Sequence, residues 1–150
     1  MVTTVPLTET AAHLRLAIVR MARRLRQDAF EAEGGGQLSP SLSAALASVG
    51  NHGPLTPSEL AERERIKRPT ATRIVANLER LGLVTRTPDP HDGRAWLVAT
   101  TPQGRDLLRR LGTRKNAYLA KRIRDLDPDE VAALDRAAAI LEHMLQEGGQ

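Results

Sequence analysis

The sequence predicts a mainly α-helical fold that contains one small β-hairpin. Four prolines each follow a residue whose side chain can cap a helix, and this arrangement marks four helix starts. The core must be aliphatic, because 41% of the 150 residues are hydrophobic but only Phe30, Trp96 and Tyr118 are aromatic. One turn-rich segment lies between two short runs of β-forming residues and predicts the hairpin.

The four helix starts share one pattern, a capping residue directly before a proline. The capping oxygen satisfies backbone N–H groups of the first turn, and proline suits the first helical position because its missing N–H is not needed there. In two cases a glutamate three residues after the cap completes a capping box. The starts are Ser39-Pro40, Thr56-Pro57 with Glu59, Thr101-Pro102 and Asp127-Pro128 with Glu130.

The N-terminal part of the chain is predicted to form two helices. The first runs from about Thr8 to Glu33 and is ended by the glycines at residues 34–36. The second covers residues 39–49 and ends at the segment 50–53, which contains two glycines. The first helix carries an apolar stripe at helical spacing, formed by Leu14, Ile18, Met21 and Leu25.

Residues 56–100 have the order of a winged helix-turn-helix. Two short helices begin at Thr56 and near Arg68, and the second of them extends from Lys67 to Leu81, where Gly82 ends it. Two strands follow, at residues 83–86 and 95–100, joined by a turn-rich tip at residues 87–93. The hairpin would be the wing of such a fold.

The helix from Lys67 to Leu81 has one apolar and one polar face. Its apolar residues, spaced to pack against the preceding helix at Leu60 and Ala61, are Ala71, Ile74, Val75 and Leu78. A polar face of this composition suits the DNA major groove, where arginine pairs with guanine and threonine meets thymine methyl groups or phosphates. An ordinary solvated helix face is the alternative. The polar face presents Arg68, Thr70, Arg73 and Asn77, with Thr72 at its margin.

Basic residues concentrate in this region. Between residues 63 and 94 there are eight Lys or Arg and four acids, a surplus equal to the net charge of +4 for the whole chain. Lys67 stands at a helix start, where a cation opposes the helix dipole, so a phosphate contact is the expected gain. Arg94, at the hairpin tip, is placed to enter a minor groove. Asp89 or Asp92 is expected to pair with Arg86 or Arg94 and fix its direction; the alternative is a solvated ion pair.

The last helix, starting at Asp127, has an unusually broad apolar face. Its second stripe contains Ala133, Ala137, Ile140 and Met144, beside a first stripe that begins at Val131. Together the two stripes are wider than one neighbouring helix would cover, so we expect a second chain to bury part of them. Packing onto the first helix of the same chain is the alternative. The residues assigned to dimerisation are Leu134, Ala138, Leu141 and Leu145.

Other functions find little support in the composition. The absence of cysteine excludes disulfides, thiolate zinc sites and thiol redox sensing. The four histidines lack metal-ligand spacing, and no catalytic or nucleotide-binding motif stands out, so we expect no metal, no cofactor and no enzyme activity. The short apolar runs and the N-terminus predict neither a membrane span nor a signal peptide, hence a cytoplasmic protein.

The segment LAERERIKRPTATRIVANLERLGLVTR, followed by PDPHDGRAWLVATTPQG, resembles the MarR family of bacterial transcription regulators. The family's wing pattern is D-x-R-D-x-R, with a threonine and a glycine opening the next helix. Its residues are matched here by Asp89, Asp92, Arg94, Thr101 and Gly104.

Three positions depart from the family pattern. His91 replaces the first wing arginine, which weakens any contact made there or makes it depend on pH. Arg65 replaces the usual turn glycine, so a left-handed non-glycine residue is expected, and Lys67 replaces a common serine.

The resemblance covers nearly the whole chain and implies a single domain over residues 1–150. Helical arms at about 8–36 and 102–147 would form the dimerisation region, around a DNA-binding lobe at about 39–100. It also implies a homodimer on a pseudo-palindromic DNA operator, mostly acting as a repressor that a small, often anionic aromatic effector releases. The residues assign no ligand pocket. A winged-helix scaffold for protein interactions and a nonspecific DNA-binding protein are the alternatives.

Overall fold

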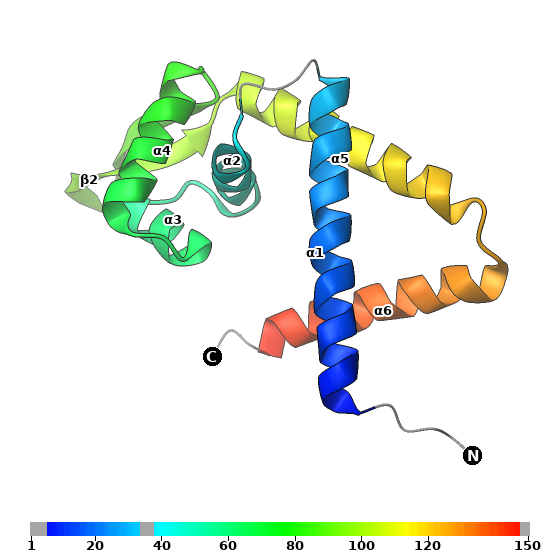
Figure 1. Cartoon of the computed structure of the whole chain (residues 1–150). Coiled ribbons are helices and arrows are strands. Elements are labelled where there is room, and N and C mark those ends of the chain that lie inside the picture. The colour runs from blue at the N-terminus through cyan, green and yellow to red at the C-terminus, as the bar shows by residue number, and fades with distance from the viewer. Residues whose placement is uncertain (1–5, 34–37, 148–150) are drawn as a thin grey trace. The chain divides into compact units, whose positions relative to one another are not determined.

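The computed structural model describes residues 6–33 and 38–147, and the chain divides into two compact units, Met1–Lys115 and Asn116–Gln150. One two-stranded antiparallel hairpin stands among helices, which confirms the predicted fold class (Figure 1). The elements in chain order are α1 (Leu7–Ala32), α2 (Pro40–His52), α3 (Pro57–Glu64), α4 (Arg68–Arg80), β1 (Val84–Asp89), β2 (Asp92–Thr100), α5 (Pro102–Ile123) and α6 (Pro128–Glu147).

All four predicted helix caps are confirmed. The Ser39 hydroxyl accepts a hydrogen bond from the Leu42 N–H at 3.3 Å. Thr56 and Glu59 form a reciprocal capping box, with bonds of 3.1 and 2.8 Å. At the start of α6, Asp127 and Glu130 form a second box, with bonds of 2.9 and 3.1 Å. The Thr101 cap accepts from the Gly104 N–H at 3.0 Å.

Two predicted boundaries were wrong. Helix α2 continues through Gly50 to His52 and ends where the Gly53 N–H donates to the Val49 carbonyl at 2.8 Å. Residue 50 lies inside this helix as a glycine, and a Cβ there would lie 2.5 Å from a methyl of Leu108. The hairpin strands reach Asp89 and Asp92, so its tip is shorter than residues 87–93.

The end of α1 is defined by Ala32, its last helical residue, and by the Glu33 N–H, which donates to the Ala29 and Phe30 carbonyls. The glycines at residues 34–36, predicted to end this helix, lie outside the described residues.

The core of the first unit lies among α2, α3, α4 and the hairpin, which gather on one side of α1 in Figure 1. The apolar face predicted for α4 is buried, as are Leu60 and Ala61 of α3, and the two helices are in contact. The largest fully buried side chains are Leu46, Leu60, Val75, Leu78 and Val98. This aliphatic core fixes which face of α4 is turned outward.

The start of α5 is held against the end of α4 through Thr101. Its N–H donates to the Leu83 carbonyl at 3.0 Å, and its hydroxyl donates to the Gly82 carbonyl at 2.6 Å. Gly82 itself has a φ of 74°, a conformation that glycine adopts without strain. A Cβ on Gly104 would overlap the Leu83 carbonyl oxygen, so the backbones approach this closely only because residue 104 is a glycine.

Helix α6, in the second unit, has no buried residue in the single chain. Of the four residues assigned to dimerisation, Leu141 is half-buried, and Leu134, Ala138 and Leu145 are exposed. The adjacent stripe is open as well, with Ile140 and Met144 both more than half exposed.

Candidate nucleic-acid interface

Helix α4 presents its basic side chains on the side opposite the core. Arg68 and Arg73 are exposed, whereas Ala71 and Val75, which face the core, are fully buried. Lys67 is the N-terminal flanking residue, exposed and without a side-chain cap, so its ammonium adds to the positive end of the helix dipole. The start of α4 therefore carries accessible positive charge from Lys67, Arg68 and the helix dipole.

The polar residues of α4 differ in accessibility. Thr72, predicted at the margin, is exposed, and its hydroxyl donates to the Arg68 carbonyl at 3.1 Å. Thr70 is half-buried and lines a pocket beneath the helix. Asn77 is half-buried and accepts a bond from Arg80 at 2.8 Å. The accessible set that the structure brings together is thus Arg68, Thr72 and Arg73.

The turn between α3 and α4 is made without glycine. Arg65 has φ 51° and ψ 46°, the left-handed conformation expected from the sequence. The Ile66 N–H donates to the Ala61 carbonyl at 2.9 Å and closes a turn of the Schellman type. A non-glycine residue is held in this conformation at a cost of about 1–2 kcal/mol.

The wing acids act on the backbone rather than on arginine. A carboxylate oxygen of Asp89 accepts from the His91 N–H at 2.8 Å, and one of Asp92 accepts from the Arg94 N–H at 3.0 Å. The predicted pairing of these acids with Arg86 or Arg94 side chains was wrong among the described residues. Short aspartates satisfy the N–H two residues on in a tight turn, so their charge stabilises the tip.

Arg94 and Arg86 therefore occupy different settings. Arg94 is exposed at the tip of the hairpin. Arg86 has its guanidinium Nε 3.1 Å from a carboxylate oxygen of Glu79 and lies over the Trp96 ring, 4.2 Å from the centroid. The sequence suggested Asp89 or Asp92 as the partner of Arg86 because these acids are close to it along the chain. Its actual partners lie on other elements, Glu79 on α4 and Trp96 on the opposite strand.

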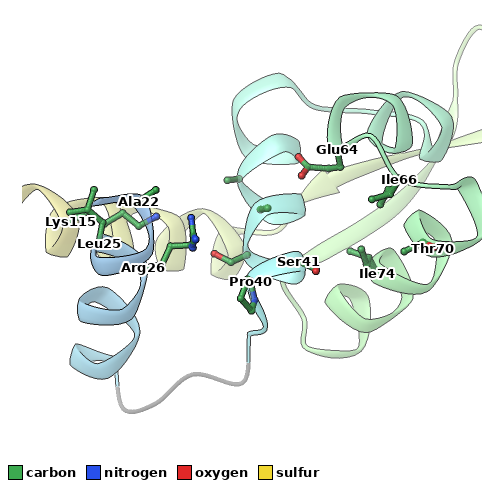
Figure 2. Close-up of a pocket in the computed structure, with 13 residues that line it drawn as sticks. Ala22, Leu25, Arg26, Pro40, Ser41, Glu64, Ile66, Thr70, Ile74 and Lys115 are labelled. Atoms are coloured by element: carbon green, nitrogen blue, oxygen red, sulfur yellow. The ribbon is translucent and has the colours of Figure 1, made fainter. Parts of the chain in front are cut away.

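A pocket of about 570 Å³ lies behind α4 in the first unit. Figure 2 shows Lys115 and Arg26 at one end, and Glu64, Thr70 and Ile74 from the α3–α4 region at the other. The pKa of Lys115 lies below its ordinary value, chiefly because burial disfavours the ammonium and also because Arg26 repels it. No sequence pattern predicts this pocket, since its lining residues come from α1, α2, the α3–α4 region and α5.

In the described part of the chain, no three His, Asp or Glu side chains gather as a metal site. None of the helices drawn there combines the length and the apolar character that a membrane crossing requires.

These features define the class of protein: a winged helix-turn-helix with a basic, outward-facing second helix, as in DNA-binding regulators. A family model described as the MarR family matches residues 37–95. Over 137 residues the chain is 35% identical to an HTH-type transcriptional regulator of Mycobacterium tuberculosis, covering 91% of this chain and 93% of that protein.

Solved structures agree. A candidate transcriptional regulator from Pseudomonas aeruginosa superposes with a TM-score of 0.78 at 30% identity, covering 93% of this chain and 95% of that one. A MarR family protein from Bacillus stearothermophilus has the same fold, with a TM-score of 0.77 at 22% identity over 95% and 99% of the two chains. The chain belongs to the MarR family and is a DNA-binding transcription regulator, not an enzyme.

Proposed function

We propose that this regulator is a homodimeric repressor that binds a pseudo-palindromic operator. Two copies of α4 would enter successive major grooves, and the two wings would reach the flanking minor grooves. The observation that carries the proposal is the exposure of Arg68 and Arg73 on α4 together with Arg94 at the hairpin tip. The residues proposed to contact DNA are Lys67, Arg68, Thr70, Thr72, Arg73, Asn77 and Arg94. The other three residues predicted for this interface, Arg86, Asp89 and Asp92, are bound within the protein, the arginine to Glu79 and Trp96 and the two acids to the backbone of the wing tip.

A dimer is supported by apolar residues that the single chain leaves uncovered. In α6, Leu134 is 49% and Leu145 is 79% exposed. Helix α1 also leaves Leu14, Ile18 and Met21 exposed. Monomers rarely expose so many large apolar side chains along a helix, and a second copy would cover those of each helix.

Footprinting on DNA neighbouring the gene tests the proposal. Protection of an inverted repeat with half-sites about one helical turn, roughly 10 bp, apart is expected. Arg73→Ala should weaken operator binding by about 1–3 kcal/mol and relax preference at one position per half-site. Lys67→Ala should weaken all sequences alike and flatten the salt dependence.

The alternatives give different outcomes. Equal affinity for all fragments would indicate a nonspecific DNA-binding protein, and no salt-dependent binding would indicate an interaction scaffold. An unchanged footprint for Arg73→Ala would assign recognition to another surface. Repression itself is measured as reporter transcription from the footprinted operator, which should rise when the regulator is deleted.

A small anionic aromatic effector is proposed to bind the pocket behind α4. The basic end, Lys115 and Arg26, suits a carboxylate, while Leu25, Ile66 and Ile74 suit an apolar ring. Thr70 and Ile74 belong to α4, so a ligand there would touch the back of the proposed recognition helix. The resulting shift of α4 would lower affinity for the operator.

Calorimetric titration with benzoate and 4-hydroxybenzoate tests the effector. Lys115→Met should weaken binding of these anions at least tenfold, about 1.4 kcal/mol, because it removes the half-buried amino group that would bind the carboxylate. Lys121→Met, on the same helix but exposed, is the matched control and should leave binding unchanged. Equal binding by both variants would place the anion elsewhere.

A further inference from the structure

Arg86 lies on the inner side of the wing. It pairs with Val98 in the antiparallel register, and residues paired across two strands share a face. Val98 is fully buried in the core, so Arg86 points the same way, toward α4. Two residues before Val98 on β2, Trp96 lies on this face too, half-buried and packed against the core.

The guanidinium of Arg86 contacts Glu79 through its edge and the Trp96 ring through its face. Its Nε is 3.1 Å from a Glu79 carboxylate oxygen, and its planar group covers the Trp96 ring at 4.2 Å from the centroid. Glu79 lies in the last turn of α4, and Trp96 lies in β2. The Arg86 side chain, from β1, therefore connects the end of α4 to both strands of the wing.

We infer that Arg86 is a positioning residue, which fixes the wing relative to α4, rather than a contact to DNA. The inference rests on the proposed placement of α4 and the wing on an operator. A DNA-binding surface that consists of a recognition helix and a wing binds well only if the helix and the wing reach their grooves together. The contacts of Arg86 with Glu79 and Trp96 (the Arg86 bridge) set that geometry in the free protein. The free-energy cost of ordering the wing on DNA binding is therefore lower.

Arginine suits this role better than lysine. Its planar group can stack on an aromatic ring while an edge N–H donates to a carboxylate, whereas a lysine ammonium is a point charge without a plane. Glu79 also offsets the charge that Arg86 would offer to a phosphate. The side chain of Arg86 is 36% exposed, so the pair lies at the margin of the interface rather than outside it.

Glu79→Gln separates positioning from contact, because the two roles predict effects of opposite sign. If Arg86 contacts a phosphate, removing the acid releases the guanidinium and strengthens DNA binding. If Arg86 positions the wing, the same change weakens operator binding by up to about fivefold, the range for the one exposed ion pair that this substitution removes. Glu62→Gln removes an exposed acid on α3 and controls for net charge.

The salt dependence of affinity provides a second measurement. Each phosphate contact contributes about 0.9 to the slope of log K against log salt. Arg86→Gln is expected to weaken operator binding and leave this slope unchanged, whereas Arg94→Gln, on the same hairpin, should lower it. Arg86→Lys retains the charge and is expected to restore little of the lost affinity, because the planar stack is absent.

Trp96, the only tryptophan, reports on the bridge in the free protein. In Glu79→Gln and Arg86→Gln its emission is expected to shift to longer wavelength, since the ring face becomes accessible to water. Circular dichroism confirms that the variants fold.

A lower salt slope in Arg86→Gln would overturn the inference, as would wild-type or tighter binding by Glu79→Gln. If instead Arg94→Gln left binding intact, the proposed wing contact would fail, while the emission shift would still measure the bridge.

Discussion

Replacing Leu145 by Asp tests the proposed dimer most directly, and the expected effect can be worked out from the exposed fraction of this side chain. Leu145 is 79% exposed in the single chain, and full burial of a leucine contributes about 1.5–3 kcal/mol, so covering it contributes roughly 1.2–2.4 kcal/mol per protomer. A twofold dimer buries the residue twice. The loss is therefore about 2.4–4.8 kcal/mol, which raises the dimer Kd by roughly 50- to 3000-fold.

The size of the apolar surface makes the dimer sensitive to this loss. The exposed fractions along α6 together equal about three whole side chains, and their burial contributes roughly 8–17 kcal/mol to a dimer. Association itself opposes this by an estimated 4–15 kcal/mol. Helix α6 alone is thus close to balance, so the exposed residues of α1 would need to be covered too. The residues summed are Val131, Leu134, Ile140, Met144 and Leu145.

Sedimentation equilibrium and light scattering at low micromolar concentration measure the effect. The wild type is expected near twice 16.4 kDa, and Leu145→Asp near the monomer mass or unfolded. Gln146→Asp adds the same charge at the neighbouring exposed position outside both stripes and should remain dimeric. A wild-type monomer, or a Leu145→Asp dimer of unchanged Kd, would refute the reasoning and with it the paired half-sites.

The other predictions concern single positions. Arg94→Ala should leave the melting temperature unchanged and lower operator affinity at least tenfold, about 1.4 kcal/mol, measured by fluorescence titration; unchanged affinity would make the wing arginine a solvated residue. Arg65→Gly should stabilise the fold by about 0.5–1 kcal/mol in urea unfolding, since it removes left-handed strain, and no gain would show that the strain is relieved elsewhere. Gly104→Ala should destabilise it by about 1–3 kcal/mol, because the added Cβ meets the Leu83 carbonyl; Gly112→Ala, where a Cβ meets nothing within 4 Å, is its control.

The helix starts were predictable because capping is local. A hydroxyl or carboxylate and the N–H groups it accepts from lie within three residues, so a short sequence pattern specifies the geometry. The left-handed conformation of Arg65 was predictable because this residue stands where the family usually has the turn glycine. The inner face of α4 followed from apolar spacing alone.

Boundaries and partners set by tertiary contact were not predictable. Gly50 looks like a helix end, but it lies within α2. The space that a Cβ would take there is occupied by Leu108, which is far along the chain. Arg86 was expected to meet an acid in its own hairpin, whereas its partner is at the end of α4. The pocket behind α4 combines side chains from segments as far apart as residues 22 and 115, and no periodicity marks them.

The acids within the basic segment 63–94 have structural roles. Between residues 63 and 94, every acid has a partner in the same chain: Glu64 accepts from Ser48, Glu79 forms an ion pair with Arg86, Asp89 accepts from the His91 N–H and Asp92 from the Arg94 N–H. Each carboxylate thus stabilises a local structure, whether a helix contact, the base of the wing or its tip. The accessible basic side chains at the start of α4, along it and at the wing tip are Lys67, Arg68, Arg73, Arg80 and Arg94. The acids therefore stabilise the fold of the interface, and the surplus of four bases over acids gives the positive field that a phosphate backbone meets.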